Sequence, residues 1–157
     1  MSVYVVRHAD ALGRSHWSGD DIGRPLTEKG FGQARGLIDL LADNRIDTIV
    51  SSPAVRCTQS VVPLADDRGL DVVEDAALWE GGALAPFRRL VDELDHAVFC
   101  SHGDLIPALI DELIGEGMDA IGRDCKKGST WVLEREGPTF VRGTYLPPPK
   151  RNKGDGD

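Results

Sequence analysis

The chain has 157 residues, of which 41% are hydrophobic, and this supports one buried core rather than two domains. Its formal net charge of -8 at pH 7 disfavours binding to nucleic-acid polymers and anionic membranes, because its field repels polyanions. No apolar run approaches the length of a membrane-spanning helix and the first residues lack a leader pattern, so we expect a cytoplasmic protein. Cys57, Cys100 and Cys125 are odd in number without C-x-x-C spacing, which predicts buried thiols.

The first predicted strand ends where charge begins. Residues 2–6 are mostly β-branched or aromatic, as in a strand buried on both faces, and Arg7 and His8 follow directly. The pattern recurs at residues 98–101, where an apolar strand is followed by His102. The carboxyl ends of parallel strands form the crevice in which ligands bind. A cation beside imidazoles at that edge suits an anion.

The remaining segments alternate between helix and strand. Residues 9–25 are rich in Gly, Asp and Ser and predict a long loop over the strand ends. Apolar spacing and capping residues, among them Thr27, predict helices at residues 28–44, 53–67, 84–94 and 103–114. Strands are predicted at residues 46–51, 71–74, 96–101, 129–133 and 139–145. The last two are expected to form a hairpin on the sheet edge. Residues 147–157 predict a disordered tail, so the domain is expected to cover residues 1–146.

This alternation predicts an α/β domain of three layers, with a mainly parallel central sheet and helices on both faces. Its carboxyl edge would gather a small set of polar side chains. They are Arg7, His8, Arg56, His102 and Glu80. Two guanidiniums offer forked donors matched to phosphate oxygens, and helix N-termini add positive potential. The predicted ligand is a phosphoryl group.

Several other phosphate chemistries are excluded by missing motifs. The P-loop pattern is absent, and the glycines of residues 30–36 lie inside a helical pattern rather than after a strand. Neither Cys57 nor Cys100 is followed by the arginine that a cysteine-dependent phosphatase needs. His16 and His96 have no paired ligand spacing, so no metal is expected.

Four ordered motifs then resemble the histidine phosphatase superfamily, which has the phosphoglycerate mutase-like fold. They are Val6-Arg7-His8-Ala9, Pro25-Leu26-Thr27-Glu28-Lys29-Gly30 followed by Gln33-Ala34, Ser51 to Gln59, and Ser101-His102-Gly103. The chain's short length resembles the SixA-type phosphohistidine phosphatases. Residues 17–26 and 100–110 are also similar to the phosphatase domain that follows a Nudix domain in some actinobacterial proteins. The chain has no Nudix portion, and Ala9 replaces the family's usual glycine.

The resemblance implies a covalent mechanism without a cofactor. His8 would attack phosphorus and carry the phosphoryl group, while Arg7, Arg56 and His102 hold its oxygens. Glu80 would protonate the leaving group, and Glu74 and Asp75 are alternatives. We expect a phosphatase for a phosphomonoester or phosphohistidine. The alternatives are a phosphohydrolase for nucleotide di- or polyphosphates and a non-catalytic phosphate-binding module.

Four residues near the predicted site are open to two interpretations. Glu28 orients the site or favours a helix N-terminus, and the helix role is preferred. Arg24 contacts a phosphate or pairs with Asp20 or Asp21, and pairing is preferred. Trp17 and Trp79 stack on a base or pack in their loops. The expected partner is a phosphorylated small molecule or a phosphohistidine protein, and the expected state is a monomer or weak dimer.

Overall fold

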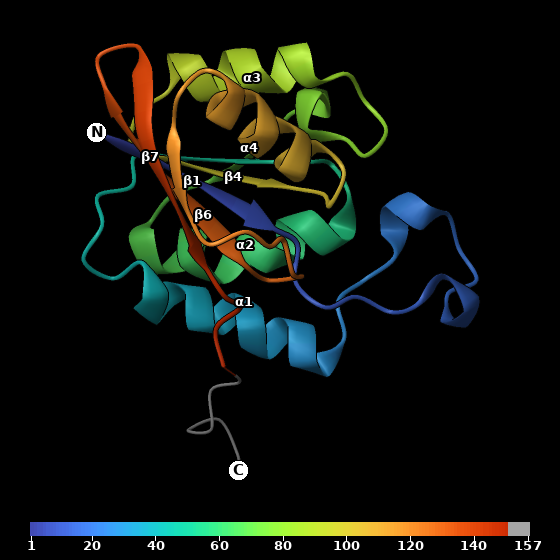
Figure 1. Ribbon diagram of the computed structural model, residues 1–157. Helices are drawn as coiled ribbons and strands as arrows, with labels where there is room; N and C mark the ends of the chain where they lie inside the picture. The colour runs from blue at the N-terminus through green and yellow to red at the C-terminus, as the bar shows by residue number, and fades with distance from the viewer. Residues whose placement is uncertain (151–157) are drawn as a thin grey trace.

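The computed structural model describes residues 1–150 as a seven-stranded sheet between two layers of helices (Figure 1). The strands are β1 (Ser2–Arg7), β2 (Thr48–Ser51), β3 (Val72–Glu74), β4 (Ala97–Ser101), β5 (Asp119–Ile121), β6 (Thr130–Glu136) and β7 (Thr139–Leu146). The α-helices are α1 (Glu28–Leu40), α2 (Val55–Arg68), α3 (Leu84–Glu93) and α4 (Leu105–Gly115). Three short 3-10 helices complete the set: η1 (Arg14–His16), η2 (Asp21–Gly23) and η3 (Ala76–Leu78).

The sheet is mixed but mostly parallel, in the order β3-β2-β4-β1-β6-β7-β5. Strands β1 to β4 all run parallel, β6 runs antiparallel to β1 and β7, and β5 runs parallel to β7. Helices α1 and α2 cover one face, and α3 and α4 cover the other (Figure 1). The predicted fold class is therefore confirmed.

Strand β1 contributes to both cores, because successive side chains point to opposite faces. Val3 and Val5 pack with α3 and α4, whereas Tyr4 and Val6 pack with α1 and α2. Burial of each such apolar side chain contributes about 1.5–3 kcal/mol to stability. The central position of β1 follows from this two-sided burial, which the sequence pattern predicted.

The register of the parallel strands fixes the functional edge. Arg7 at the end of β1 pairs with Ser101 at the end of β4, and Ser51 at the end of β2 pairs with Cys100. The residues that follow these three strands therefore leave the sheet side by side.

Helices α2 and α4 each begin two residues later than predicted, at Val55 and Leu105. The hydroxyl of Ser52 accepts a bond from the Ala54 amide, and the N-cap of the helix is Ala54. The residues before each helix instead form turns at the sheet edge. By contrast, Thr27 caps α1 as predicted, since its side chain accepts from the Gly30 amide.

The predicted edge hairpin lies inside the sheet, which corrects the sequence-based expectation. Strands β6 and β7 pair as a hairpin, but β1 flanks one side and β5 the other. Strand β5 was not predicted, because its three residues lie between Gly117 and Gly122 and show no alternating pattern. Both outermost strands, β3 and β5, have only three residues.

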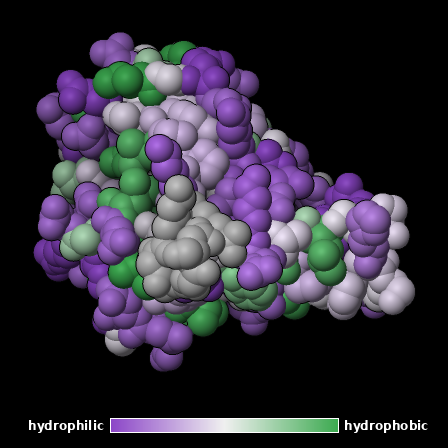
Figure 2. All heavy atoms as spheres, turned by 90° about the horizontal axis from the view of Figure 1, so that it is seen from below, coloured by the Kyte–Doolittle hydropathy of each residue, from purple (hydrophilic) through white to green (hydrophobic). Residues whose placement is uncertain are grey.

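Residues 9–26 form an irregular projection, here called the arm, which contains η1 and η2. The Leu12 amide donates to the Pro25 carbonyl, and Ala11 forms a bridge with Leu26, so the two ends of the arm are held together. Seen from the α1 side, the arm extends beyond the body of the molecule (Figure 2). It begins directly after His8, so its base lies at the functional edge.

The chain beyond β7 has no regular structure as far as residue 150, and Pro149 lies against Gly36 of α1. The remainder of the predicted disordered tail, residues 151–157, lies outside the described residues. The domain boundary at residue 146 stays a prediction. No helix within residues 1–150 is both long and apolar enough to span a membrane.

Candidate active site

Two histidines meet at the carboxyl ends of β1 and β4. His8 follows β1 and its amide donates to the Ser101 carbonyl at 3.1 Å, while His102 follows β4. The ring centroids lie 5.5 Å apart. His8 is 5% exposed and His102 is fully buried. The sheet register thus holds both imidazoles at one place, shielded from solvent.

The hydrogen bonding of His8 defines its reactive atom. Its Nδ1 lies 2.8 Å from the Ala9 carbonyl oxygen, which can only accept, so Nδ1 carries the proton. Burial lowers the pKa of the His8 imidazole to about 3, and the charges of His102, Arg56 and Arg7 act in the same direction. The bond to the Ala9 carbonyl opposes this shift without cancelling it. His8 is therefore neutral near pH 7, with a free lone pair on Nε2.

Two arginines bring unpaired donors to the same edge. Arg56, in the first turn of α2, is fully buried, and Arg7 binds the Cys125 carbonyl through Nη1 at 2.6 Å. The Nε atoms of both side chains are buried and have no hydrogen-bond partner among residues 1–150. A buried donor without a partner costs about 1–3 kcal/mol or more when charged, so an anion here would satisfy both. We call Arg7, His8, Arg56 and His102 the phosphate cradle.

Gly103 sets the position of the Arg7 guanidinium. A Cβ at residue 103 would lie 2.7 Å from Arg7 Cζ and 2.9 Å from its Nε, closer than real Cβ contacts. The guanidinium therefore lies directly over the glycine Cα. The sequence predicts Gly103 as the first residue of α4. In the structure it precedes the helix and leaves room for the Arg7 side chain.

Ser52 and Cys57 contact the far side of the His102 ring. His102 Nε2 lies 2.9 Å from Ser52 Oγ and 3.6 Å from Cys57 Sγ, whereas Nδ1 lies 3.5 Å from Arg56 Nη2. A guanidinium only donates, so in this contact Nδ1 accepts from Arg56 Nη2, and Nε2 carries the proton that it donates to the Ser52 hydroxyl. Trp79 packs edge-on against the same ring at 5.7 Å. Sequence reasoning assigned none of these contacts, and no spacing signal identifies them.

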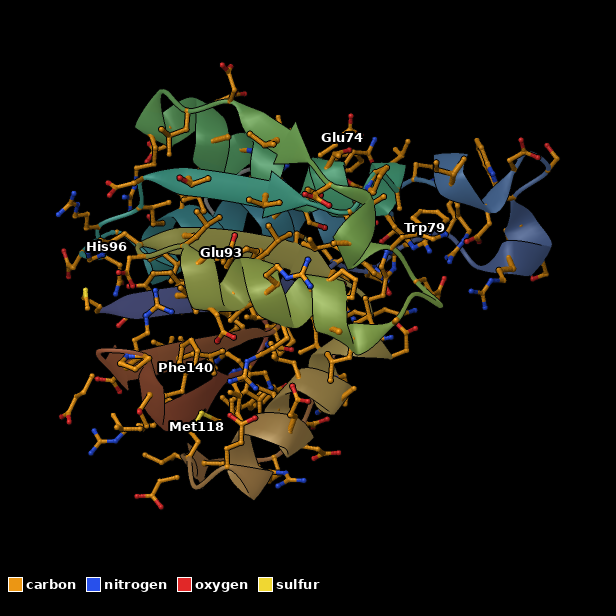
Figure 3. The ribbon with its side chains drawn as sticks, turned by 90° about the horizontal axis from the view of Figure 1, so that it is seen from above. Glu74, Trp79, Glu93, His96, Met118 and Phe140 are labelled. Carbon is orange, nitrogen blue, oxygen red and sulfur yellow. The ribbon has the colours of Figure 1, made fainter. Side chains whose placement is uncertain are left out.

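Of the three candidate acids, Glu80 is the one that contacts the cradle within residues 1–150. Its Oε2 accepts from Arg56 Nη2 at 3.0 Å. The amide of the next residue, Gly81, donates to the Asp104 carboxylate at 2.8 Å, which fixes this loop. The Asp75 carboxylate instead caps η3 through the Ala77 amide. Glu74 is exposed at the end of β3 (Figure 3).

Asp21, in the arm, is a second carboxylate at Arg56 that the sequence did not assign to the site. Its main-chain oxygen accepts from Arg56 Nη1 at 2.9 Å, and its Oδ2 lies 3.2 Å from Nη2. Arg24 pairs with its Oδ1 at 2.9 Å, so the preferred pairing role of Arg24 is confirmed. Burial acts to raise the pKa of Asp21, but the bond from Arg24 and nearby arginine charges outweigh it and hold that pKa below its usual value. Asp21 therefore stays ionised and anchors Arg56.

The remaining candidates lie outside the cradle. Glu28 is the first residue of α1. His16 is exposed in the arm, and His96 lies at the end of the sheet opposite Trp79 (Figure 3). Trp17 is partly buried, with Nε1 donating to the Asp20 carbonyl at 2.9 Å.

Known proteins resemble this chain in sequence and in structure. It is 33% identical to an 8-oxo-(d)GTP phosphatase of Mycolicibacterium smegmatis, and the match covers 94% of this chain and 48% of that protein. The chain thus spans about half the length of that relative. A structure from Agrobacterium tumefaciens, assigned as the phosphohistidine phosphatase SixA, is 25% identical with a TM-score of 0.73, covering 94% of this chain and 97% of that one.

A second solved structure, of the protein histidine phosphatase SixA in complex with tungstate, shares the fold. Its TM-score is 0.72 at 21% identity, covering 96% of this chain and 97% of that one. These matches confirm the predicted resemblance to SixA-type proteins. Residues 3–85 match the family model of the histidine phosphatase superfamily, branch 1, and the chain belongs to that family of hydrolases.

Proposed function

We propose that the protein is a phosphatase that transfers a terminal phosphoryl group to His8 and then to water. The observation that carries this proposal is the pair of buried, unpartnered Nε donors of Arg7 and Arg56 beside a neutral His8 imidazole. Phosphoryl transfer requires mainly positioning and charge stabilisation, and these two arginines supply both. Among residues 1–150, no three His, Cys, Asp or Glu side chains gather to hold a metal ion.

The first step is an in-line displacement at phosphorus. The lone pair of His8 Nε2 forms a bond to phosphorus while the bond from phosphorus to the leaving group breaks. Arg7, Arg56 and His102 hold the three equatorial oxygens. The phosphate oxygens take over the bond from Arg56 to Glu80, and the Glu80 carboxylate, which then takes up the proton brought by the substrate monoanion, donates it to the leaving group. Glu80 then takes a proton from the water that cleaves the phosphorus–nitrogen bond, which releases phosphate and restores His8.

Two classes of substrate are compatible with this mechanism. A phosphohistidine side chain fits an open edge, because residues 1–150 form no large lid that would enclose a small sugar phosphate. The similarity to SixA structures supports this class. The relative from M. smegmatis supports nucleoside polyphosphates, as does the partly exposed Trp17 in the arm.

A trapped phosphoenzyme tests the mechanism. The chain is mixed with labelled phosphoramidate or p-nitrophenyl phosphate and quenched in alkali, which preserves phosphohistidine. We expect label on the wild type and none on His8→Ala, with turnover unaffected by EDTA. Turnover that strictly requires added divalent metal contradicts the proposal, as does label retained by the variant.

A substrate panel separates the classes. For a phosphohistidine substrate we expect kcat/KM to exceed that for phosphoglycerates by at least about tenfold, or ~1.4 kcal/mol in barrier. A preference for phosphoglycerates would contradict the open edge.

A further inference from the structure

Two arginines from different segments converge on one carboxylate oxygen at the mouth of the cradle. Glu80 Oε2 lies 3.0 Å from Arg56 Nη2 and 3.5 Å from Arg14 Nη2. Arg56 belongs to the cradle, whereas Arg14 comes from η1 of the arm. The Glu80 carboxylate thus marks an anion position between a buried guanidinium and an exposed one.

Of the arginines around Asp21, only Arg14 is free to turn toward a ligand. Its side chain is 68% exposed, and its ion pairs with Asp21 and Glu80 are long, at 3.4 and 3.5 Å. Exposed pairs of this kind contribute about 0–1 kcal/mol, so exchange for a ligand costs little. Arg24, in contrast, has an 8% exposed side chain and donates to the Leu12 carbonyl at 2.6 Å.

The charges at this mouth favour one further anion. The carboxylates of Asp21 and Glu80 face the guanidiniums of Arg14, Arg24 and Arg56. The three positive charges exceed the two negative ones by one. Of the three guanidiniums, that of Arg14 is the exposed one, so it is the charge that can meet a further anion.

The mechanism places the leaving group next to Arg14. In an in-line displacement the leaving group departs on the side opposite His8, where Glu80 supplies the proton. An imidazole or a simple alkoxide offers a guanidinium only one acceptor atom, and Glu80 already protonates that atom. A leaving group that is itself a phosphate offers oxygens matched to its forked donors.

A hollow beside Arg14 continues away from the cradle. Arg14, Trp17, Gly19, Asp21 and Arg24 line a space of about 150 Å³. The Trp17 ring is fixed by its bond to the Asp20 carbonyl, and a Cβ at Gly19 would lie 3.0 Å from the indole. An indole held in place presents a π surface on which a nucleobase stacks.

We infer that Arg14 and this hollow form a leaving-group subsite for nucleoside di- or polyphosphates. Arg14 binds the penultimate phosphate and Trp17 contacts the base, so the chain removes the terminal phosphate. With a nucleoside diphosphate, the bond from the terminal phosphorus to the bridging oxygen breaks. The nucleoside monophosphate keeps that oxygen and its electron pair, and inorganic phosphate follows on hydrolysis of the phosphohistidine. This inference rests on the proposed function.

A ratio of specificity constants tests the subsite. Hydrolysis of GDP and of p-nitrophenyl phosphate is measured for the wild type, Arg14→Ala and Arg45→Ala. Arg45 is the matched control: its side chain is 70% exposed, it pairs with Asp47, and it precedes β2 at the other end of the sheet. We expect Arg14→Ala to lower the ratio of kcat/KM for GDP to that for p-nitrophenyl phosphate by at least about tenfold. Arg45→Ala leaves the ratio unchanged.

A wild type that hydrolyses p-nitrophenyl phosphate but not GDP would overturn the subsite and leave the proposed function standing. An equal loss on both substrates in Arg14→Ala would also overturn it.

Binding provides a readout that does not depend on turnover. In the His8→Ala background, GDP should bind more tightly than GMP by calorimetry, and adding Arg14→Ala should remove the difference. Adding Trp17→Ala should weaken both nucleotides. Equal affinities for GDP and GMP with Arg14 present would refute the subsite, whether or not the chain is catalytically active. A catalytically inactive wild type would refute the proposed function separately.

Discussion

The phosphate cradle and the arm meet at Arg56 but are built on different principles. In the cradle, Arg56 and His102 are fully buried, and the histidines are placed by the ends of paired strands. In the arm, Arg14 is 68% exposed and its contacts are long ion pairs. The group that is transferred is thus held by the packed fold, whereas the group that departs meets Arg14, whose side chain rearranges at little cost. Substitutions in the cradle should affect all substrates equally, and substitutions facing the arm should depend on the leaving group.

The largest expected effect is that of His8→Ala, which removes the nucleophile. We expect kcat to fall by at least about 10³-fold on every phosphate substrate, as for other covalent catalysts that lose their nucleophile. Steady-state assays on p-nitrophenyl phosphate and a phosphohistidine peptide measure it, with circular dichroism as the control for folding. Retention of substantial activity on either substrate would show that another group attacks phosphorus.

Glu80→Gln separates the two regions most directly. The amide cannot give up a proton, so we expect a loss of about 10²-fold on alkyl phosphates, whose leaving groups need protonation. p-Nitrophenyl phosphate, with a far better leaving group, should lose much less. Glu74→Gln is the matched control, because Glu74 is exposed on β3. A uniform loss across leaving groups would assign Glu80 to holding Arg56 rather than to proton transfer.

Gly103→Ala tests the cradle without changing its charges. The new Cβ would displace the Arg7 guanidinium, and a displacement of about 1 Å costs up to about 10²-fold in rate. We expect kcat/KM to fall by about 10–10²-fold, in equal measure for all substrates. Gly115→Ala should behave as wild type, because the added Cβ in α4 would meet no atom within 4 Å outside its chain neighbours and the nearby helix backbone. A loss confined to one substrate class would place Arg7 at the leaving group instead.

The smallest effect concerns stability in acid. Native His8 stays unprotonated down to a pKa of about 3, whereas in the unfolded chain it binds a proton near pH 6.5. The unfolded state therefore binds more protons between these values, and stability falls on acidification through this window by up to about 1.4 kcal/mol per pH unit. From pH 7 to pH 5, urea unfolding should show a loss about 2 kcal/mol larger for wild type than for His8→Ala. His16→Ala, at an exposed position of the arm, should follow the wild type. Parallel pH dependences of the wild type and His8→Ala would mean that His8 titrates normally when folded.

The parts of the molecule that rest on periodic burial were predictable from the sequence. The strand before Arg7 and the strand before His102 are apolar runs that end in charge, and their parallel pairing brings the histidines together. Strand β5 was not predictable, because a three-residue strand between glycines has no periodicity. The sequence predicts starts for α2 and α4 that are too early, because Ser52 and Gly103 are residue types that often precede a helix. In the structure Ser52 contacts His102, and Gly103 lies against the Arg7 guanidinium.

The leaving-group side of the site could not be predicted for a different reason. Arg14 and Asp21 reach Glu80 and Arg56 through loop conformations, which leave no spacing rule in the sequence. Composition shows that residues 9–25 form a loop, but not which of its charged side chains turns inward.

The short strands at both ends of the sheet have a consequence for the behaviour of the protein at high concentration. β3 and β5 expose three residues each, so a second chain finds few free amides and carbonyls with which to extend the sheet. Each strand also carries a carboxylate, Glu74 on β3 and Asp119 on β5, beside the exposed apolar side chains Val73 and Ile121. Like charges brought together at a joined edge repel, which offsets the attraction between these apolar groups. The edges of the sheet are thereby protected against the strand-to-strand growth that leads to fibrils.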